Sequence, residues 1–403
     1  MTTAVEQSLR EKAAQRFTQL GWPTPRLEEW KYTNFAPVAK VEWRSEETPQ
    51  PIESTATLSG RAVLELQFVN GRLTGSFGDE TLGGAASTAF PSDLASIADW
   101  ERNALVALNA MHTHDGARID IAANAVVEGF IHLLFIGHGD GIWSHPRNVI
   151  VAGRGSQVTV VETYVGSGKY FTNAVTEIVA GDGAVVDHYR VQCESLDAFH
   201  YGHVAIRQER GSNVTSRGIS IGGSLVRNEV SVALAGEGAS VTLDGLFAGT
   251  GEQHLDNRTV VDHVKPHCES TQLYKGVLDQ RARGIFDGRI IVRPDAQKTN
   301  SRQENRNLLL SESAVVDSRP NLEIHNDDVK CSHGSTIGQL DEEALFYLRS
   351  RGISEEEARG LMIYAFTSEI VDRMKIEPVA EQIRGALFRS MPERLPERRG
   401  TNR

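Results

Sequence analysis

The chain contains a short motif that recurs at a nearly constant interval. Copies of glycine, a small residue, a variable residue and valine begin at Gly155, Gly183, Gly211 and Gly238, spaced 28, 28 and 27 residues apart. Each copy is a turn signal followed by a run typical of a strand. Repeats of this kind stack as coils, because one coil cannot bury its own apolar face. The spacing predicts a mainly β protein built on a parallel β-helix with coils of about 28 residues.

Other repeat architectures fit this pattern less well. The sequence has no Leu-x-x-Leu-x-Leu consensus, no Trp-Asp pair of the kind found in propeller blades, and no six-residue period of left-handed coils. An ordinary β-sandwich also alternates short strands with glycine turns, so it stays open on the pattern alone.

The strand-rich region divides the chain into four parts. Residues 1–116 are predicted to form a helical and loop region with a short β-hairpin near residues 61–77, and residues 117–340 to form the β-helix core. Helical periodicity returns in residues 341–390, where we expect a helical domain. Residues 391–403 are rich in arginine and proline, and we expect a flexible basic tail.

Composition limits the partners and the compartment. The net charge of −11 argues against binding nucleic acid through a broad basic face. Three cysteines without a Cys-x-x-Cys pair do not form a disulfide framework, and the first residues lack the pattern of a signal peptide. No apolar run approaches the roughly 18 residues of a membrane span. We expect a soluble, cytoplasmic protein.

A Cys-x-His pair, Cys331 and His333, stands just before the C-terminal helices. Side chains at i and i+2 of a strand share one face, so this pair can present a thiolate and an imidazole together. These are ligands for iron–sulfur, zinc or copper chemistry. Two ligands do not complete a metal site, so the others must come from elsewhere in this chain or from another chain. The alternative is a buried cysteine beside a hydrogen-bonded histidine.

Other chemical motifs are weaker. We interpret Cys193 as a core residue and Cys268, beside His267, as structural, because a strand would send these two neighbours to opposite faces. The polar segment 293–308 is either a solvated loop or a contact surface for another subunit. The sequence has no P-loop, so any ATP hydrolysis belongs to another chain.

Several stretches resemble a known family. They are similar to the SufB/SufD family of the SUF iron–sulfur cluster assembly scaffold, and within it to SufD subunits. The matching stretches are residues 30–33, 107–110, 288–292, 295–300, 303–311, 327–334 and 341–352. The chain lacks the extra N-terminal cysteines of SufB, which favours the SufD type.

The resemblance implies a right-handed parallel β-helix with helical parts at both ends, and a non-catalytic scaffold that pairs with SufB and docks the ATPase SufC. Cys331 and His333 match family residues at the SufB–SufD interface, where a transient iron–sulfur cluster is shared between subunits. The C-terminal helices dock SufC, which gives these candidate contacts: Leu345, Phe346, Tyr347, Leu348, Met362 and Phe366. A homodimer is a further alternative for the chain in isolation.

Two other functions remain as alternatives. One is a self-assembling structural protein without a metal role. The other is a β-helical polysaccharide-active enzyme, which is disfavoured because the acidic residues are dispersed and a secretion signal is absent.

Overall fold

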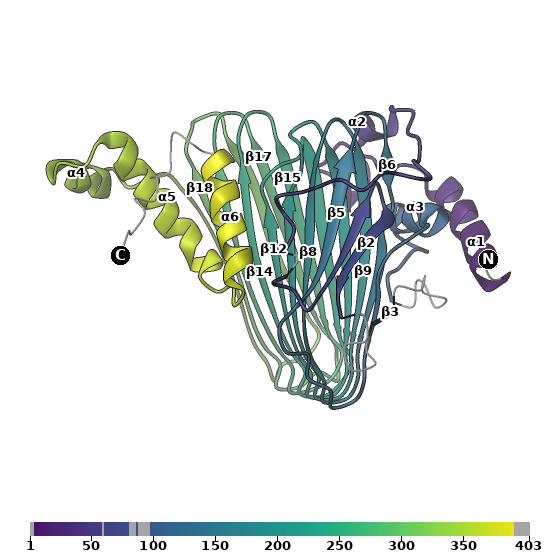
Figure 1. Ribbon diagram of the computed structural model, residues 1–403. Helices are drawn as coiled ribbons and strands as arrows, with labels where there is room; N and C mark the ends of the chain where they lie inside the picture. Colours follow the sequence, from purple (N-terminus) through teal and green to yellow (C-terminus); the bar gives the residue numbers. More distant parts are fainter. Residues whose placement is uncertain (1–3, 59, 80–85, 88–96, 391–403) are drawn as a thin grey trace.

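A computed structural model describes residues 4–58, 60–79, 86–87 and 97–390. The predicted fold class is confirmed: the protein is mainly β, a parallel β-solenoid of about 8 turns with about 29 residues per turn, and helices lie at both chain ends (Figure 1). The sandwich alternative is wrong, because successive strands within each sheet of the solenoid are parallel and follow one another coil by coil. The predicted tail, residues 391–403, lies outside the described residues.

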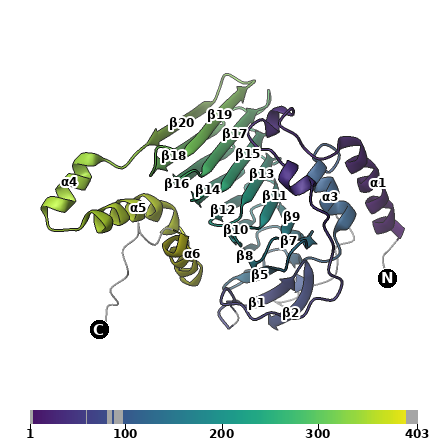
Figure 2. The ribbon, with the colours of Figure 1, turned by 90° about the horizontal axis from the view of Figure 1, so that it is seen from above.

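Two sheets form the walls of the solenoid and run side by side along its length (Figures 1 and 2). The first sheet contains, in spatial order, β2 (Arg72–Gly78), β1 (Leu64–Val69), β5 (Ile131–His138), β8 (Gln157–Ser167), β10 (Val185–Cys193), β12 (Asn213–Ser220), β14 (Ser240–Gly249), β16 (Glu269–Leu278), β18 (Asn300–Leu309) and β20 (Lys330–Gly338). The second contains β3 (Ala86–Ser87), β4 (Arg118–Ile121), β7 (Arg147–Ala152), β9 (Phe171–Ala180), β11 (Phe199–Gln208), β13 (Leu225–Leu234), β15 (His254–His263), β17 (Arg283–Val292) and β19 (Val315–Ile324), and β6 (Trp143–Ser144) pairs with β9.

The repeated motif explains both the turns and the core. Its four glycines all have positive φ, between 61° and 70°, a conformation that other residues adopt only at a cost. The backbone N–H of each glycine donates to a carbonyl of the next turn, so the turns stack as well as the strands. The motif valines then meet in register as a buried interior ladder, Val158, Val186, Val214 and Val241.

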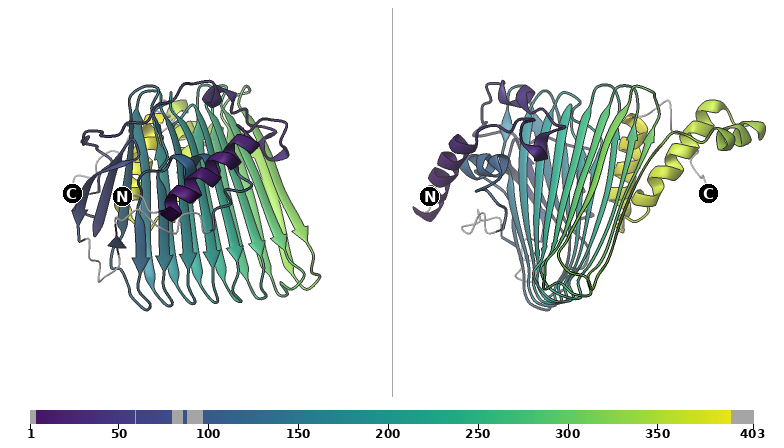
Figure 3. Two further views of the ribbon diagram at one scale, coloured as in Figure 1. Left: turned by 90° about the vertical axis from the view of Figure 1, so that its right-hand side faces the viewer. Right: turned by 180° about the vertical axis from the view of Figure 1, so that it is seen from behind.

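Helices cover the outer faces of the two sheets (Figure 3). The N-terminal cover on the second sheet contains α1 (Ala4–Leu20), a 3₁₀ turn (Glu28–Trp30), α2 (Ala36–Ala39) and α3 (Ala104–His112). The C-terminal helices are α4 (Glu342–Ser350), α5 (Glu355–Val371) and α6 (Glu377–Ser390). Apolar side chains of α5 and α6 pack on the first sheet, whereas α4 and the start of α5 project beyond it (Figures 1 and 2). None of the helices that the structure describes is long and apolar enough to cross a membrane.

Two segments differ from what their sequences suggest. Residues 300–309 form strand β18 of the solenoid, so the interpretation of 293–308 as a loop is wrong over this part. Its polar character arises because inward side chains such as Gln303, Asn305 and Asn307 are buried inside the coil. The N-terminal hairpin of β1 and β2 is not separate from the core, since β1 also pairs with β5 and extends the first sheet.

Candidate functional site

Cys331 and His333 lie in β20, the last strand of the first sheet, at the end of the solenoid where β19 closes the second sheet (Figure 2). In register they stand beside Ser301 and Gln303 of β18, and both belong to the inward-facing set of the strand. Cys331 is half-buried against an apolar cluster that includes Ile290, whereas His333 is exposed. No further coil covers this end among the described residues, so the inward side chains of β20 border the open end of the interior.

The interior becomes polar towards this end. The valine ladder of the earlier coils continues as Ser270, Ser301 and Cys331. The neighbouring column changes from Leu243 to glutamines and then a histidine, in the order Gln272, Gln303 and His333. Thus the cysteine and histidine are the outermost members of two interior columns whose last three positions can all form hydrogen bonds.

The electrostatics of the pair favour a protonated thiol. Burial raises the pKa of the Cys331 thiol. A thiolate is the form that binds metal, so the side chain needs a bound metal or a cationic neighbour to become a ligand. Among the residues that the structure describes, no group of three or more His, Cys, Asp or Glu side chains is placed to hold a metal ion.

The other two cysteines lie elsewhere. Cys268 is fully buried and its thiol donates to the carbonyl of Gly236 at 3.3 Å. Cys193 packs against the cluster beneath the C-terminal helices, and burial raises the pKa of its thiol to about 12. Neither is near Cys331 in the solenoid, because each belongs to an earlier coil.

The candidate partner contacts on the C-terminal helices differ in exposure. Phe346 and Tyr347 are exposed by 74% and 58%, whereas Leu345 is buried within the chain. Leu348 and Met362 are half-buried. The ring of Phe366 lies 4.4 Å from the ammonium group of Lys275, so this residue holds α5 on the solenoid. Within the C-terminal helices, the exposed large apolar or aromatic side chains are Phe346 and Tyr347 on α4 and Leu361 and Tyr364 on α5.

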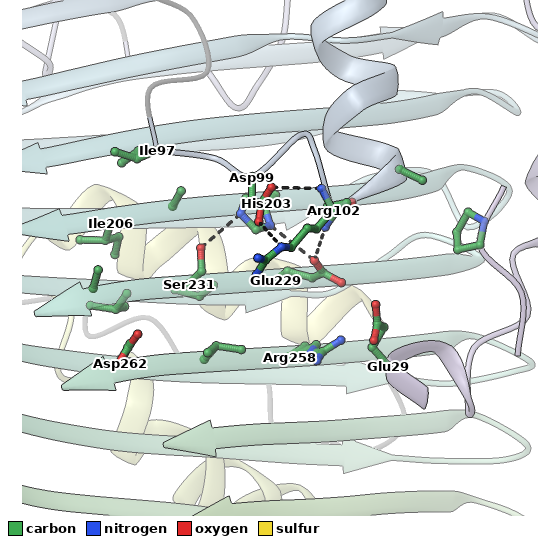
Figure 4. A pocket seen from close by; sticks show the side chains of 18 of the residues that line it. Glu29, Ile97, Asp99, Arg102, His203, Ile206, Glu229, Ser231, Arg258 and Asp262 are labelled. Carbon is green, nitrogen blue, oxygen red and sulfur yellow. Dashed lines mark hydrogen bonds and ion pairs between the residues drawn. The ribbon is translucent and has the colours of Figure 1, made fainter. Parts of the chain in front are cut away.

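Sequence reasoning missed a hollow of about 720 Å³ between the N-terminal cover and the second sheet (Figure 4). There Ser231 Oγ lies 3.3 Å from His203 Nε2, and Glu229 Oε2 lies 3.4 Å from His203 Nδ1. His203 and Glu229 are register partners one coil apart, so the repeat period could have revealed them.

The order of these three groups resembles that of serine hydrolases, but the surroundings do not support acyl transfer. β13 is paired on both sides, so its backbone N–H groups are used by the sheet and do not form an oxyanion hole beside Ser231. Glu229 also accepts hydrogen bonds from Tyr201, Asn103 and Arg227. These contacts, rather than a reaction, explain why the carboxylate is there: they fasten the N-terminal cover to the sheet.

Comparison with known proteins gives consistent matches. A family model described as the SufBD core domain of SUF-system FeS cluster assembly matches residues 135–366. The iron–sulfur cluster assembly protein SufD of Escherichia coli (strain K12) is 30% identical over 393 residues, 94% of this chain and 91% of the relative. SufD of Bacillus subtilis (strain 168) is 30% identical over 296 residues, 72% of this chain and 68% of the relative.

A plant protein also matches over nearly the full length. The chloroplastic protein ABCI7 of Arabidopsis thaliana is 29% identical over 407 residues, which cover 94% of this chain and 84% of the relative. The match to the family model covers more than half of the chain and coincides with most of the solenoid. The chain therefore belongs to the SufBD family of SUF-system iron–sulfur cluster assembly proteins.

Proposed function

We propose that the chain is a non-catalytic scaffold subunit that helps to assemble an iron–sulfur cluster at the open end of its solenoid. The observation that carries the proposal is the placement of Cys331 and His333 at inward positions of the last strand, beside the uncovered end of the interior. Soft and borderline ligands at an uncovered end suit a cluster that is bound by two subunits and then released.

The open end supports pairing with a SufB-type subunit. β19 and β20 each have an unpaired edge among the described strands, and such edges add a further strand readily. Ile324 and Ile337, at inward positions of these two strands, are exposed by 43% and 53%. A second solenoid placed on this end would bury both and would supply the ligands that the half-site needs.

The projecting helices support docking of a SufC-type ATPase. Phe346 and Tyr347 on α4, with Leu361 and Tyr364 on α5, are exposed apolar or aromatic side chains. The helix α4 and the start of α5 project beyond the solenoid (Figure 2). Exposed aromatic residues on a rigid element are common anchors of protein interfaces. ATP hydrolysis then belongs to the docked partner, and its motion reaches the solenoid through α5.

His333→Ala tests the cluster site. The complex is reconstituted with SufB-type and SufC-type subunits, and its bound iron and sulfide are measured after cluster assembly. We expect iron and sulfide to fall strongly while size-exclusion chromatography shows an intact complex. His325→Ala is the matched control, because His325 is also exposed at this end but pairs with Glu323. Wild-type cluster content in His333→Ala would remove this residue from the mechanism.

Phe346→Ala tests the docking surface. We expect weaker capture of the SufC-type ATPase, by about 2 kcal/mol or more if Phe346 is a central anchor, without loss of thermal stability. Phe77→Ala, at an exposed phenylalanine of β2, controls for loss of an exposed aromatic ring. Equal ATPase binding by both variants would contradict docking through α4.

A further inference from the structure

The coil beneath His333 contains a buried amide without a partner. The side chain of Gln303 is fully buried, and neither its oxygen nor its nitrogen has a hydrogen-bond partner among the described residues. Leaving both groups unpaired in the core lowers stability, so their retention needs a reason.

The shape of the coil makes room for this amide. A Cβ at Gly288, on the opposite sheet, would lie 2.4 Å from Gln303 Nε2, so the glycine allows the side chain to cross the interior. In the same column, Gln272 already has a partner, because its oxygen accepts a hydrogen bond from Thr259 at 2.8 Å. Gln303 is the member of the column whose amide oxygen and nitrogen are both unpaired.

The adjacent column of inward side chains, which contains Asn305 and Ser335, is linked by hydrogen bonds. Ser335 donates to Ser318 at 2.7 Å, and Ser318 donates to Asn305 at 2.7 Å, which links the last coil to the one below. In the column of Gln303, the residue that occupies the corresponding outer position is His333. Its imidazole is exposed, and the strands of a sheet are only about 4.8 Å apart, so a change of rotamer brings the ring within reach.

We propose that Gln303 is a positioning residue for His333, whose imidazole N–H donates to the Gln303 side-chain oxygen when the ring turns in over the open end. The other ring nitrogen is then unprotonated and directed out of the stack, as a metal ligand must be. Histidine ligands are commonly oriented in this way by an acceptor on the second nitrogen. The inference rests on the proposed function, in which His333 binds metal.

Gln303→Met tests it. Methionine keeps the length of the side chain and removes the unpaired amide, so we expect thermal stability to stay the same or rise. Co²⁺ affinity of the reconstituted complex, measured by absorbance titration, should nevertheless fall about 10- to 100-fold. A purely structural residue would not show this combination.

Gln272→Met is the matched control, because it makes the same change one coil away and does not border His333. We expect wild-type Co²⁺ affinity. Gln303→Asn retains an amide but is one methylene shorter, so it should also bind Co²⁺ more weakly than the wild type. It replaces Gln303→Met in the test if the methionine variant does not accumulate.

The outcomes separate this inference from the function on which it rests. If Gln303→Met binds Co²⁺ as the wild type does while His333→Ala binds it weakly, the positioning role is wrong and the cluster site stands. If His333→Ala also binds Co²⁺ normally, the cluster site at His333 is wrong and the inference is wrong with it.

Discussion

Arg227 holds the N-terminal cover on the second sheet, and Arg227→Met should release it. The guanidinium is buried and donates to Glu229 at 2.8 Å, to Asp256 at 2.5 Å and to the carbonyl of Glu29 at 2.9 Å. It also lies 3.8 Å from the centre of the Trp30 ring. The family-like stretch 30–33 is therefore a clamp: its tryptophan stacks on the arginine, and its threonine donates to Asp256.

The magnitude follows from the two carboxylates that the substitution leaves behind. Removing one partner of a buried ion pair typically costs about 3–5 kcal/mol, and a desolvated cation–π contact adds about 2 kcal/mol. Part of this cost is avoided because Glu229, whose pKa Arg227 holds well below its usual range although burial alone would raise it, can take up a proton. We expect a net loss of about 4 kcal/mol.

The loss should be local. Coils of a solenoid contact only their neighbours, so detaching the cover from the second sheet does not unfold the first sheet. Hydrogen–deuterium exchange should become faster in residues 22–44 and stay unchanged in β18 and β20. Arg293→Met, which removes a partly exposed pair with Asp262, should cost less than about 1 kcal/mol. Unchanged exchange in residues 22–44 of Arg227→Met would refute the reasoning.

Four further substitutions test other parts of the protein. Burial alone would raise the pKa of Glu65, but its hydrogen bond with His132 and other contacts lower the pKa from 4.5 to about 2. The ionised carboxylate should therefore stabilise the fold by on the order of 3 kcal/mol above pH 4.5, and this contribution should be lost as the pH falls from 4.5 to 2. Acid denaturation of Glu65→Gln compared with wild type measures it. Gly116→Ala, whose Cβ would lie 1.8 Å from a backbone carbonyl, should cost about 3 kcal/mol in urea unfolding. A Cβ at Gly183 would meet no other atom, but the residue has a positive φ. Gly183→Ala should therefore lower the free energy of unfolding by only about 1 kcal/mol. Lys275→Met should speed proteolysis of α5, since the buried ammonium donates to the carbonyl of Phe366 at 2.8 Å.

The period of the motif was enough to predict the architecture, because its glycine and valine have separate physical tasks. The glycine supplies the positive φ of each turn, and the valine forms the interior ladder. The same logic failed at residues 300–309, where Gln303, Asn305 and Asn307 occupy inward positions. A rule that assigns polar residues to the surface cannot recognise a strand whose buried side carries amides.

The candidate site was only partly visible in the sequence. The spacing of Cys331 and His333 predicts a shared strand face, but their place at an uncovered end depends on how many coils the chain forms. The pairs His203–Glu229 and Gln303–His333 could be found only by applying the repeat period across coils, because the two members of each pair lie about one coil apart in sequence. Local strand patterns alone do not fix this register.

The two ends of the stack differ in a way that limits growth. At one end the first sheet finishes in the antiparallel strand β2, which reverses the chain direction, while the other end leaves parallel edges on both β19 and β20. A neighbour that continues the parallel coils would join at β19 and β20. Two molecules joined through this end bury these edges against each other, which favours a closed pair over a fibre.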